Sequence, residues 1–271
     1  MTIGKRIKQA RLAAGLSLRQ LADEVGVSAM AISKYERDLD VPSSGVLLRL
    51  ARALGVKTDY FFRTVQVMLS HPAQCKRATM PQKQQLIIGQ IQDWLERYLT
   101  VESFLSLDEQ CLRFSIPEQV NRPVRTLGEA ERAAEELRTA WGLGVGPIAS
   151  LIEVLEDRGI KIGMVDRNDH FDASIFWADD TIPVIVVKRD LPGDQQRFHF
   201  AHELGHLILK VEPPLKEEDA ANRFARAFIV PEAAARRELG AKRQRLSLYE
   251  LHMLKHLYGF SMQAWISRAK D

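Results

Sequence analysis

The stretch His202-Glu203-Leu204-Gly205-His206 constrains the fold of this chain more than any other feature. It lies within residues 194–210, where apolar side chains occupy almost every side of a helical projection, so we expect a buried central helix. Histidines four residues apart lie on one face of a helix, separated by one turn. A buried helix keeps two histidines and a glutamate only where something satisfies them, because an unpaired buried charge costs several kcal/mol.

This spacing allows both imidazole rings to bind one zinc ion, with Glu203 placed to act as the base for a water molecule. The motif therefore predicts a zinc hydrolase, and most simply a peptidase. Two histidines and a carboxylate suit Zn²⁺ best, although Mn²⁺ or Fe²⁺ fits the same ligands. The alternative is a pair of core histidines that are hydrogen-bonded to backbone carbonyl groups and bind no metal.

The helix expected after Pro213-Pro214 offers the third metal ligand. Glu218 and Asn222 are four residues apart, so both can face the same ion. We expect Glu218 to bind the metal and Asn222 to orient one of the histidine ligands. Glu217 replaces Glu218 as the ligand if the helix begins at a different residue. A Glu-x-x-x-Asn pairing is the pattern of gluzincin peptidases, with Asn in place of the more usual Asp.

These residues together resemble the ImmA/IrrE metallopeptidase family over about residues 130–271. The resemblance is carried by Arg197, Phe198, Ala201-His202-Glu203-Leu204-Gly205-His206, Glu218, Ala221, Asn222, Phe224, Ala225, Pro231 and the tail Tyr258-Gly259-Phe260-Ser261-x-Gln263-Ala264. It implies that the substrate is a transcriptional repressor, cleaved to turn on stress or mobile-element genes. Members of this family often carry a repressor-like domain at the N-terminus.

Residues 1–62 predict five short helices, two of which form a helix-turn-helix. Ser17 is the expected N-cap of the first helix of this pair, and Gly26 ends that helix in the left-handed conformation. Ser28 then caps the second helix, over residues 29–37. A pair of helices with this spacing is typical of DNA-binding proteins.

The string of this region resembles the Xre/Cro/phage-repressor family. It reads Ser17-x-x-Gln20-Leu21-Ala22-x-x-x-Gly26-Val27-Ser28-x-x-x-Ile32-Ser33-x-Tyr35-Glu36. The resemblance implies that the helix after Ser28 enters the major groove of a double-stranded DNA operator, with Ala29, Met30 and Lys34 facing base edges. The full set of expected DNA contacts is Ser17, Arg19, Ser28, Ala29, Met30, Ser33, Lys34 and Arg37.

Charge supports a phosphate partner at this end of the chain. Residues 1–66 contain 11 Lys and Arg against 6 Asp and Glu, a net charge of +5, whereas residues 126–271 carry −3. Ala29 and Met30 cannot make the bidentate hydrogen bonds that read bases, so we expect a homodimer to strengthen modest binding. The alternative for this domain is a protein-interaction role on the same scaffold.

The sequence predicts an α+β chain of three parts. An all-α helix-turn-helix domain covers residues 1–66, a helical connector covers 67–125, and a gluzincin-like domain covers 126–271. In the connector, residues 82–107 show a helical pattern with apolar and aromatic side chains on one face. We expect this helix to pack on a neighbouring domain, or alternatively to pair with its copy in a dimer.

The sequence of the third part, residues 126–271, predicts two helices, three strands and then the helix of the zinc motif. The helices are expected at residues 129–141 and 148–158, and the strands at 160–165, 173–178 and 182–188. The short gaps between the strands favour a small antiparallel sheet. Pro183 suggests that the third strand begins at an edge of that sheet, since proline cannot donate a ladder hydrogen bond.

Several other side chains have weaker interpretations. His170 lies in a polar turn, where it either stabilises an oxyanion or simply faces solvent. His252 and His256 repeat the four-residue spacing without a glutamate between them, so we expect a surface pair. Cys75 and Cys111 are too few for a disulfide framework and fit a reducing compartment. No signal-peptide core or membrane-length apolar run is evident, so we expect a cytoplasmic protein without a membrane partner.

Two hypotheses about function follow. In the first, a DNA-binding transcriptional regulator carries a zinc-dependent endopeptidase that cleaves a repressor, either itself or a partner. In the second, a repressor or antitoxin uses its zinc domain to sense a signal or bind a partner protein without turnover. Glu203 favours the first hypothesis, because a purely structural zinc site has no use for a base.

Overall fold

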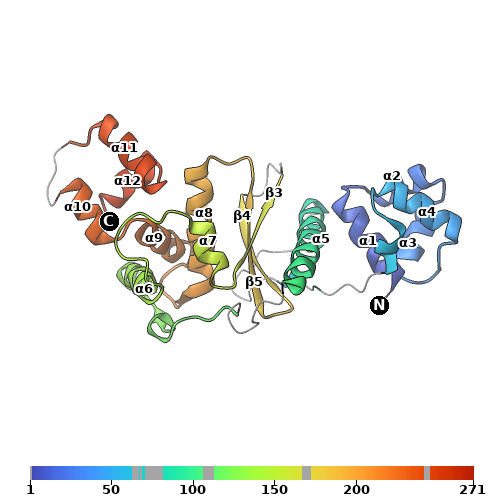
Figure 1. The fold of residues 1–271 in the computed structure, drawn as a ribbon, viewed down its shortest axis with the longest axis horizontal. Coiled ribbons are helices and arrows are strands. Elements are labelled where there is room, and N and C mark those ends of the chain that lie inside the picture. Colours follow the sequence, from blue (N-terminus) through green and yellow to red (C-terminus); the bar gives the residue numbers. More distant parts are fainter. Residues whose placement is uncertain are drawn as a thin grey trace. The chain divides into compact units, whose positions relative to one another are not determined.

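The computed structural model describes residues 2–62, 67, 69–70, 82–105, 113–166, 172–240 and 245–271. Its chain divides into two compact units, shown together in Figure 1. The first contains residues 1–108 and 177–180, and the second contains 109–176 and 181–271. His170, Cys75 and Cys111 lie outside the described residues. Within those residues, no helix has both the length and the apolar character needed to cross a bilayer.

The first unit begins with the five short helices that the sequence predicts. They are α1 (Ile3–Ala13), α2 (Leu18–Val25), α3 (Ala29–Glu36), α4 (Ser44–Ala53) and the 3₁₀ helix η1 (Thr58–Phe62). Their shared core contains Ile7, Ala10, Leu21, Ala22, Val25, Ile32, Leu47, Leu50, Ala51, Leu54, Tyr60 and Phe61. The N-cap of α2 forms a complete capping box, and Gly26 ends this helix in the left-handed conformation at φ 70°.

A buried ion pair joins α1 to α3. Arg11 Nε lies 2.5 Å from Glu36 Oε1, and Arg11 Nη2 lies 3.0 Å from Glu36 Oε2. Arg11 also donates a hydrogen bond from Nη1 to the carbonyl oxygen of Leu16 at 2.8 Å. The two side chains are only 10% and 6% exposed, so this bidentate pair fixes the second helix of the helix-turn-helix on α1.

Helix α5 (Gln82–Phe104) belongs to the first unit and packs along α1, as Figure 1 shows. Ile91 and Leu95 are buried in this contact. Gly89 allows close approach, since a Cβ atom there would lie 2.9 Å from the Cβ atom of Leu12. The expectation that this helix packs on a neighbouring domain is confirmed, and the helix ends at Phe104 rather than at residue 107.

The second unit is an α+β assembly, which confirms the predicted fold class. Its helices are α6 (Leu127–Ala140), α7 (Leu151–Glu156), α8 (Gly193–Ile208), α9 (Glu217–Ile229), α10 (Glu232–Leu239), α11 (Leu248–Tyr258) and α12 (Met262–Arg268). The short elements are η2 (Glu118–Val120), β2 (Pro123–Val124) and β6 (Lys210–Val211), and β2 and β6 pair in parallel.

The main sheet has the order β1-β4-β5-β3. Its strands are β1 (Leu69–Ser70), β3 (Lys161–Val165), β4 (Ala173–Ala178) and β5 (Ile182–Lys188). The three strands of the second unit lie close to their expected ranges, and α8 packs next to β5. This arrangement places the helix of the His202–His206 motif on a sheet whose strands are largely buried.

The expectation of an antiparallel sheet is wrong for β3, which runs parallel to β5 with Lys161 opposite Val184. The chain reverses direction from β3 to β4 and again from β4 to β5, so β3 and β5 point the same way. In the sheet, β3 lies beside β5 rather than beside β4. The edge position expected for β5 is also wrong, since β4 and β3 flank it. Pro183 is tolerated because the ladder with β3 begins one residue later.

Replacing Arg11 by Met leaves the Glu36 carboxylate buried without its partner. We expect the free energy of unfolding of the first unit to fall by about 3–5 kcal/mol. Urea denaturation of the full chain measures the loss, and hydrogen exchange of α1 and α3 assigns it to this unit. The double variant Arg11→Met with Glu36→Leu should recover most of the loss, because it leaves no unpaired charge.

The exposed ion pair between Arg236 and Glu232 on α10 provides the control. Replacing Arg236 by Met should change stability by less than about 0.5 kcal/mol, since solvent screens a surface pair of this kind. Equal losses for Arg11→Met and Arg236→Met would show that the buried pair does not hold α3 on α1.

Candidate metal centre

Close packing of α8 on α9 determines where the site forms. A Cβ atom at Gly205 would lie 3.1 Å from the Cα atom of Ala221 and 3.2 Å from Phe224 Cδ1. Ala221 and Phe224 of α9 face Gly205, and both are buried. The two helix backbones therefore approach closely at Gly205, and the first turn of α9 lies beside the histidine face of α8.

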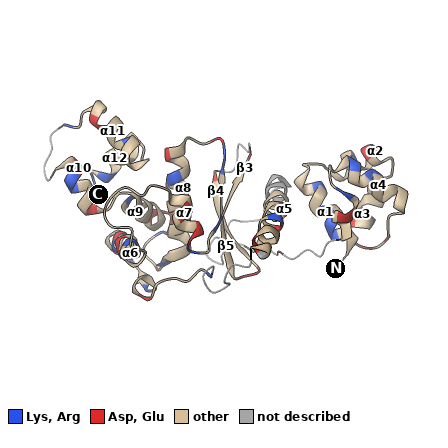
Figure 2. Ribbon diagram, viewed as in Figure 1, with Lys and Arg blue, Asp and Glu red and all other residues tan. Residues whose placement is uncertain are grey.

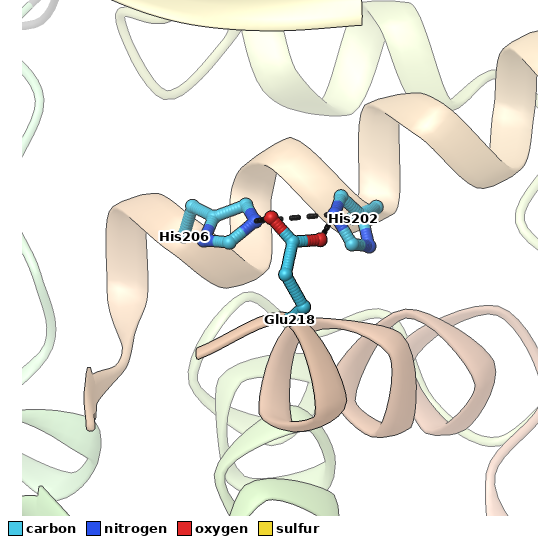
Figure 3. Close-up of side chains that lie close together, drawn as sticks. All are labelled: His202, His206 and Glu218. Carbon is cyan, nitrogen blue, oxygen red and sulfur yellow. Dashed lines mark hydrogen bonds and ion pairs between the residues drawn. The ribbon is translucent and has the colours of Figure 1, made fainter. Parts of the chain in front are cut away.

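Three side chains converge at this contact. Figure 3 shows Glu218 reaching from the start of α9 toward the two imidazole rings on α8. His202 Nε2 lies 3.1 Å from His206 Nε2 and 3.3 Å from Glu218 Oε2. His206 Nε2 lies 3.7 Å from Glu218 Oε1. Among the residues that the structure describes, this is the one group of three potential metal ligands, with all ligand atoms within 4.8 Å.

These distances fit one metal ion. Two nitrogen ligands about 2.05 Å from a tetrahedral zinc ion lie roughly 3.3 Å apart, close to the separation of the two Nε2 atoms. The histidine side chains are 12% and 13% exposed, whereas Glu218 is 62% exposed. The histidines thus form the buried side of the group, and Glu218 borders solvent.

The electrostatics of His202 suit a metal ligand. Burial, and next the neighbouring His206, lower the pKa of His202 to about 4, against the opposing charge of Glu218. The imidazole is therefore neutral at neutral pH, which is the state that binds metals. Within the described residues its buried Nδ1 atom has no hydrogen-bond partner. The side chain of Asn222 acts in the opposite direction, since its hydrogen bond raises the pKa of His202. Asn222 is therefore a candidate to orient the His202 ring.

The remaining groups of the motif take definite positions. Glu203 is buried at 6% exposure, one residue after His202 on α8. Helix α9 begins at Glu217, and it is the next residue, Glu218, whose carboxylate reaches the histidines. The Glu217 carboxylate is not a member of the group of three. The alternative ligand considered from the sequence is therefore not favoured by the geometry.

The His202–His206 motif alone does not predict which aromatic side chains pack around His202. The ring of Phe198 lies 6.2 Å from His202 and 6.4 Å from Phe260, measured between ring centroids. Arg197 donates to the carbonyl oxygen of Ile148, and its side chain lies against Gly259. These contacts connect the first half of α8 to residues 148, 259 and 260.

The other histidines that the structure describes do not join the site. His199 is half-buried, burial lowers its pKa, and it is outside the group of three. His252 and His256 are exposed on α11 with ring centroids 4.5 Å apart. Across the described ranges, no third potential ligand completes a group with this pair.

The expected DNA contacts lie on α2 and α3. Arg19, Met30, Lys34 and Arg37 are exposed, while Ala29 packs partly against the core of its own domain. Ser33 is half-buried. Figure 2 shows basic and acidic positions interspersed along the ribbon of α1 to α4. The two N-cap residues, Ser17 and Ser28, are exposed. The Ser17 hydroxyl accepts a hydrogen bond from the backbone N–H of Gln20 at 3.2 Å, and the Ser28 hydroxyl accepts one from that of Ala31 at 3.1 Å.

Replacing Gly205 by Ala tests the close packing of α8 on α9. Alanine favours a helix over glycine by about 1 kcal/mol, but here its Cβ atom meets backbone. We expect a net loss of about 1–3 kcal/mol in the free energy of unfolding, measured by urea denaturation. Gly193→Ala is the matched control, because a Cβ atom there meets nothing within 4 Å. A Gly205→Ala protein as stable as the control would contradict the close contact.

Two parts of the chain match models of known protein families. Residues 7–61 match the helix-turn-helix family, and residues 156–270 match the IrrE N-terminal-like domain family. The regulator ImmR of Bacillus subtilis, described as an HTH-type transcriptional regulator, is 38% identical over 60 residues, which is 22% of this chain and 47% of ImmR. An uncharacterized HTH-type transcriptional regulator of Rickettsia conorii is 42% identical over 64 residues, covering 24% of this chain and 51% of the relative.

A further relative is an uncharacterized transcriptional regulator in the ATPase CF(0) region of Rhodospirillum rubrum. It is 41% identical over 64 residues, which is 24% of this chain and 59% of that protein. The chain spans about half the length of the curated relatives it matches. This chain therefore joins an Xre-like helix-turn-helix domain to a domain of the IrrE-like peptidase family.

Proposed function

We propose that this protein is a DNA-binding transcriptional regulator with a zinc-dependent endopeptidase that cleaves a repressor. The repressor is either the protein itself or a partner, and cleavage serves a stress or mobile-element response. The observation that carries the proposal is the convergence of His202, His206 and Glu218, with Glu203 buried on the same helix. A purely structural metal site would need the three ligands but would have no use for Glu203 as a base.

The metal would be held by His202, His206 and Glu218. Three protein ligands leave one position of a tetrahedral ion for water or substrate, which is the arrangement of catalytic rather than structural zinc. When bound, zinc supplies a Lewis acid that polarises a peptide carbonyl group and lowers the pKa of water toward 7. Zn²⁺ is the best match to these ligands, and Mn²⁺ or Fe²⁺ would use the same three.

The chain's own residues carry the proton transfers. In this proposal Glu203 accepts a proton from the attacking water and passes it to the leaving amine nitrogen. Asn222 holds the orientation of His202, and Phe198 packs against the same ring. The exposed side of the site at Glu218 admits an extended peptide to the two histidines.

The proposal gives α3 the role of recognition helix in a double-stranded operator. Met30 and Lys34 are exposed on this helix, and Arg19 and Arg37 border it. Since the base-facing positions offer few hydrogen-bond donors, a homodimer would supply the remaining affinity. A protein that binds operators works where the DNA is, so we propose a cytoplasmic location.

The second candidate function is a repressor or antitoxin without turnover. It is favoured by curated relatives that match over 60 and 64 residues and are named as HTH-type transcriptional regulators. In that case the IrrE-like domain would bind a partner protein or sense a signal, and Glu203 would have no catalytic part. Measurements of metal binding and of cleavage separate the two candidates.

We expect the purified protein to bind one zinc ion, measured by competitive titration with a chromophoric chelator. Replacing Glu218 by Gln should weaken zinc binding by more than about 100-fold, because loss of an outer partner alone costs 10- to 100-fold. Glu217→Gln is the matched control on the neighbouring residue and should bind as the wild type does. His252→Ala on α11 should also leave zinc binding unchanged. Equal weakening by the two glutamine variants would refute Glu218 as the ligand.

Replacing Glu203 by Gln should leave zinc binding intact and abolish cleavage, since the amide cannot accept the proton. Mass spectrometry of protein N-termini in cells that express either form would detect the cleaved repressor. New N-termini should appear with the wild type and disappear with Glu203→Gln. The same new N-termini in both strains would remove Glu203 from the mechanism, and none in either strain would favour the repressor without turnover.

A further inference from the structure

Helix α11, all of whose residues the structure describes, carries no charged side chain on its exposed face (Figure 1). The buried residues of this helix are Leu251, Leu254 and Tyr258. Its six exposed positions are Leu248, Tyr249, His252, Met253, His256 and Leu257. A helix face that only meets water is usually rich in charged residues, so this face is suited to contact another surface.

The charged residues of α11 lie beside this face and not on it. Glu250 and Lys255 are both half-buried, and Lys255 pairs with Asp194 at 3.1 Å. By contrast, Leu248 is 75% exposed and Tyr249 is 74% exposed. An apolar centre without charges and a polar border are the pattern of a protein–protein interface.

Two histidines lie near the middle of this face, one helical turn apart. The ring centroids of His252 and His256 are 4.5 Å apart, and their planes cross at 75°. For His202 and His206 of the candidate metal centre the corresponding values are 4.8 Å and 78°. The exposed pair is therefore arranged as the buried pair is, and it can bind one metal ion through both rings.

One chain supplies only half of such a site. Among the described residues, no third potential ligand forms a group with His252 and His256. A tetrahedral ion bound by these two rings keeps two positions open. Because the pair is exposed, a second protein molecule can reach those positions.

A second copy of this chain offers the matching ligands. The two histidines lie on either side of the middle of α11. Two α11 helices that pack antiparallel about a two-fold axis at this point bring all four imidazole rings to the axis. The same packing places Leu248 and Tyr249 of one copy against Leu257 of the other. The face is thus complementary to itself, as a two-fold contact requires.

The size of the face shows why a metal ion is needed. With 11 residues, α11 is about 16 Å long, so its exposed face covers on the order of a few hundred Å². A stable interface buries about 800 Å² on each partner. Apolar contact alone would therefore give a weak dimer, and binding of an ion by four histidines adds the remaining free energy.

We propose that the exposed face of α11 is a metal-dependent contact between two copies of this chain. His252 and His256 of both copies bind one divalent transition-metal ion, and imidazole ligands suit zinc, copper or nickel. This ion is separate from the one at His202, so the proposal holds whether or not the protein cleaves a repressor. In a dilute chelator titration the chains stay apart, and only the tight ion at His202 is measured.

Sedimentation velocity of the full zinc-loaded chain tests the proposal, before and after two further equivalents of Zn²⁺ are added. The average mass of the particles should at least double, whatever contacts the first unit makes. Isothermal titration calorimetry should show the uptake of one additional ion for every two chains. The double variant His252→Ala with His256→Ala should lose both effects. Met253→Lys should weaken the zinc-dependent association by at least about 10-fold, because it places a charge within the contact.

Two variants serve as controls. Val145→Lys adds the same charge at an exposed apolar residue outside α11, and it should associate as the wild type does. Glu203→Gln should also associate normally, which separates this proposal from the proposed peptidase activity. Uptake of one additional ion per chain without a change in mass would overturn the proposal, because it would show a chelate within a single chain. An unchanged mass and no uptake, or equal association of the double histidine variant, would overturn it as well.

Discussion

The contact between α8 and α9 at Gly205 controls the geometry of the candidate metal centre. Helix α8 supplies two histidines that are one turn apart, and α9 supplies the carboxylate only if its first turn lies against them. A side chain larger than hydrogen at Gly205 would meet the backbone of Ala221 and force the two helices apart. The ligand distances around His202 therefore depend on a residue that binds nothing itself.

Buried charges hold α9 in that position from its other side. Arg223 of α9 and Arg268 of α12 both bind Glu131 of α6, and Arg268 is almost fully buried. Burial opposes ionisation of Glu131, but hydrogen bonds and charge from Arg268 and Arg223 outweigh it and lower the pKa of Glu131. Arg138 of α6 adds a hydrogen bond to the carbonyl oxygen of Phe228 at 2.7 Å, near the end of α9. The helix that presents Glu218 is thus tied to two others.

In the first unit, a buried ion pair and a close approach at a glycine likewise hold the helices together. The pair between Arg11 and Glu36 holds α3, and Gly4 lets α1 approach the end of α3, where Asp38 accepts its N–H group at 3.1 Å. Helix α5 then covers α1.

Short-range sequence patterns are sufficient to predict several helices of this protein and two of the candidate metal ligands. Serine caps and glycine stops located α2 and α3, and the four-residue spacing of His202 and His206 predicted one ligand pair on one helix face. These features depend on residues close in sequence, so they can be read without the fold. Glu218 was preferred over Glu217 from helix spacing alone, and only the start of α9 decided which carboxylate reaches the histidines.

Other features depend on residues far apart in the chain, and only the tertiary structure decided them. The parallel pairing of β3 with β5 was missed because strand order is set by which hydrophobic faces pack, not by the length of the gaps. The role of Gly205 also emerged only from the tertiary structure, because a missing Cβ atom matters only where another backbone lies close to it. The sequence by itself determined the chemistry available at His202, Glu203 and His206. The packing of α8 on α9 decided that the carboxylate of Glu218 lies beside the two imidazole rings, because that contact joins segments that are separate in the sequence.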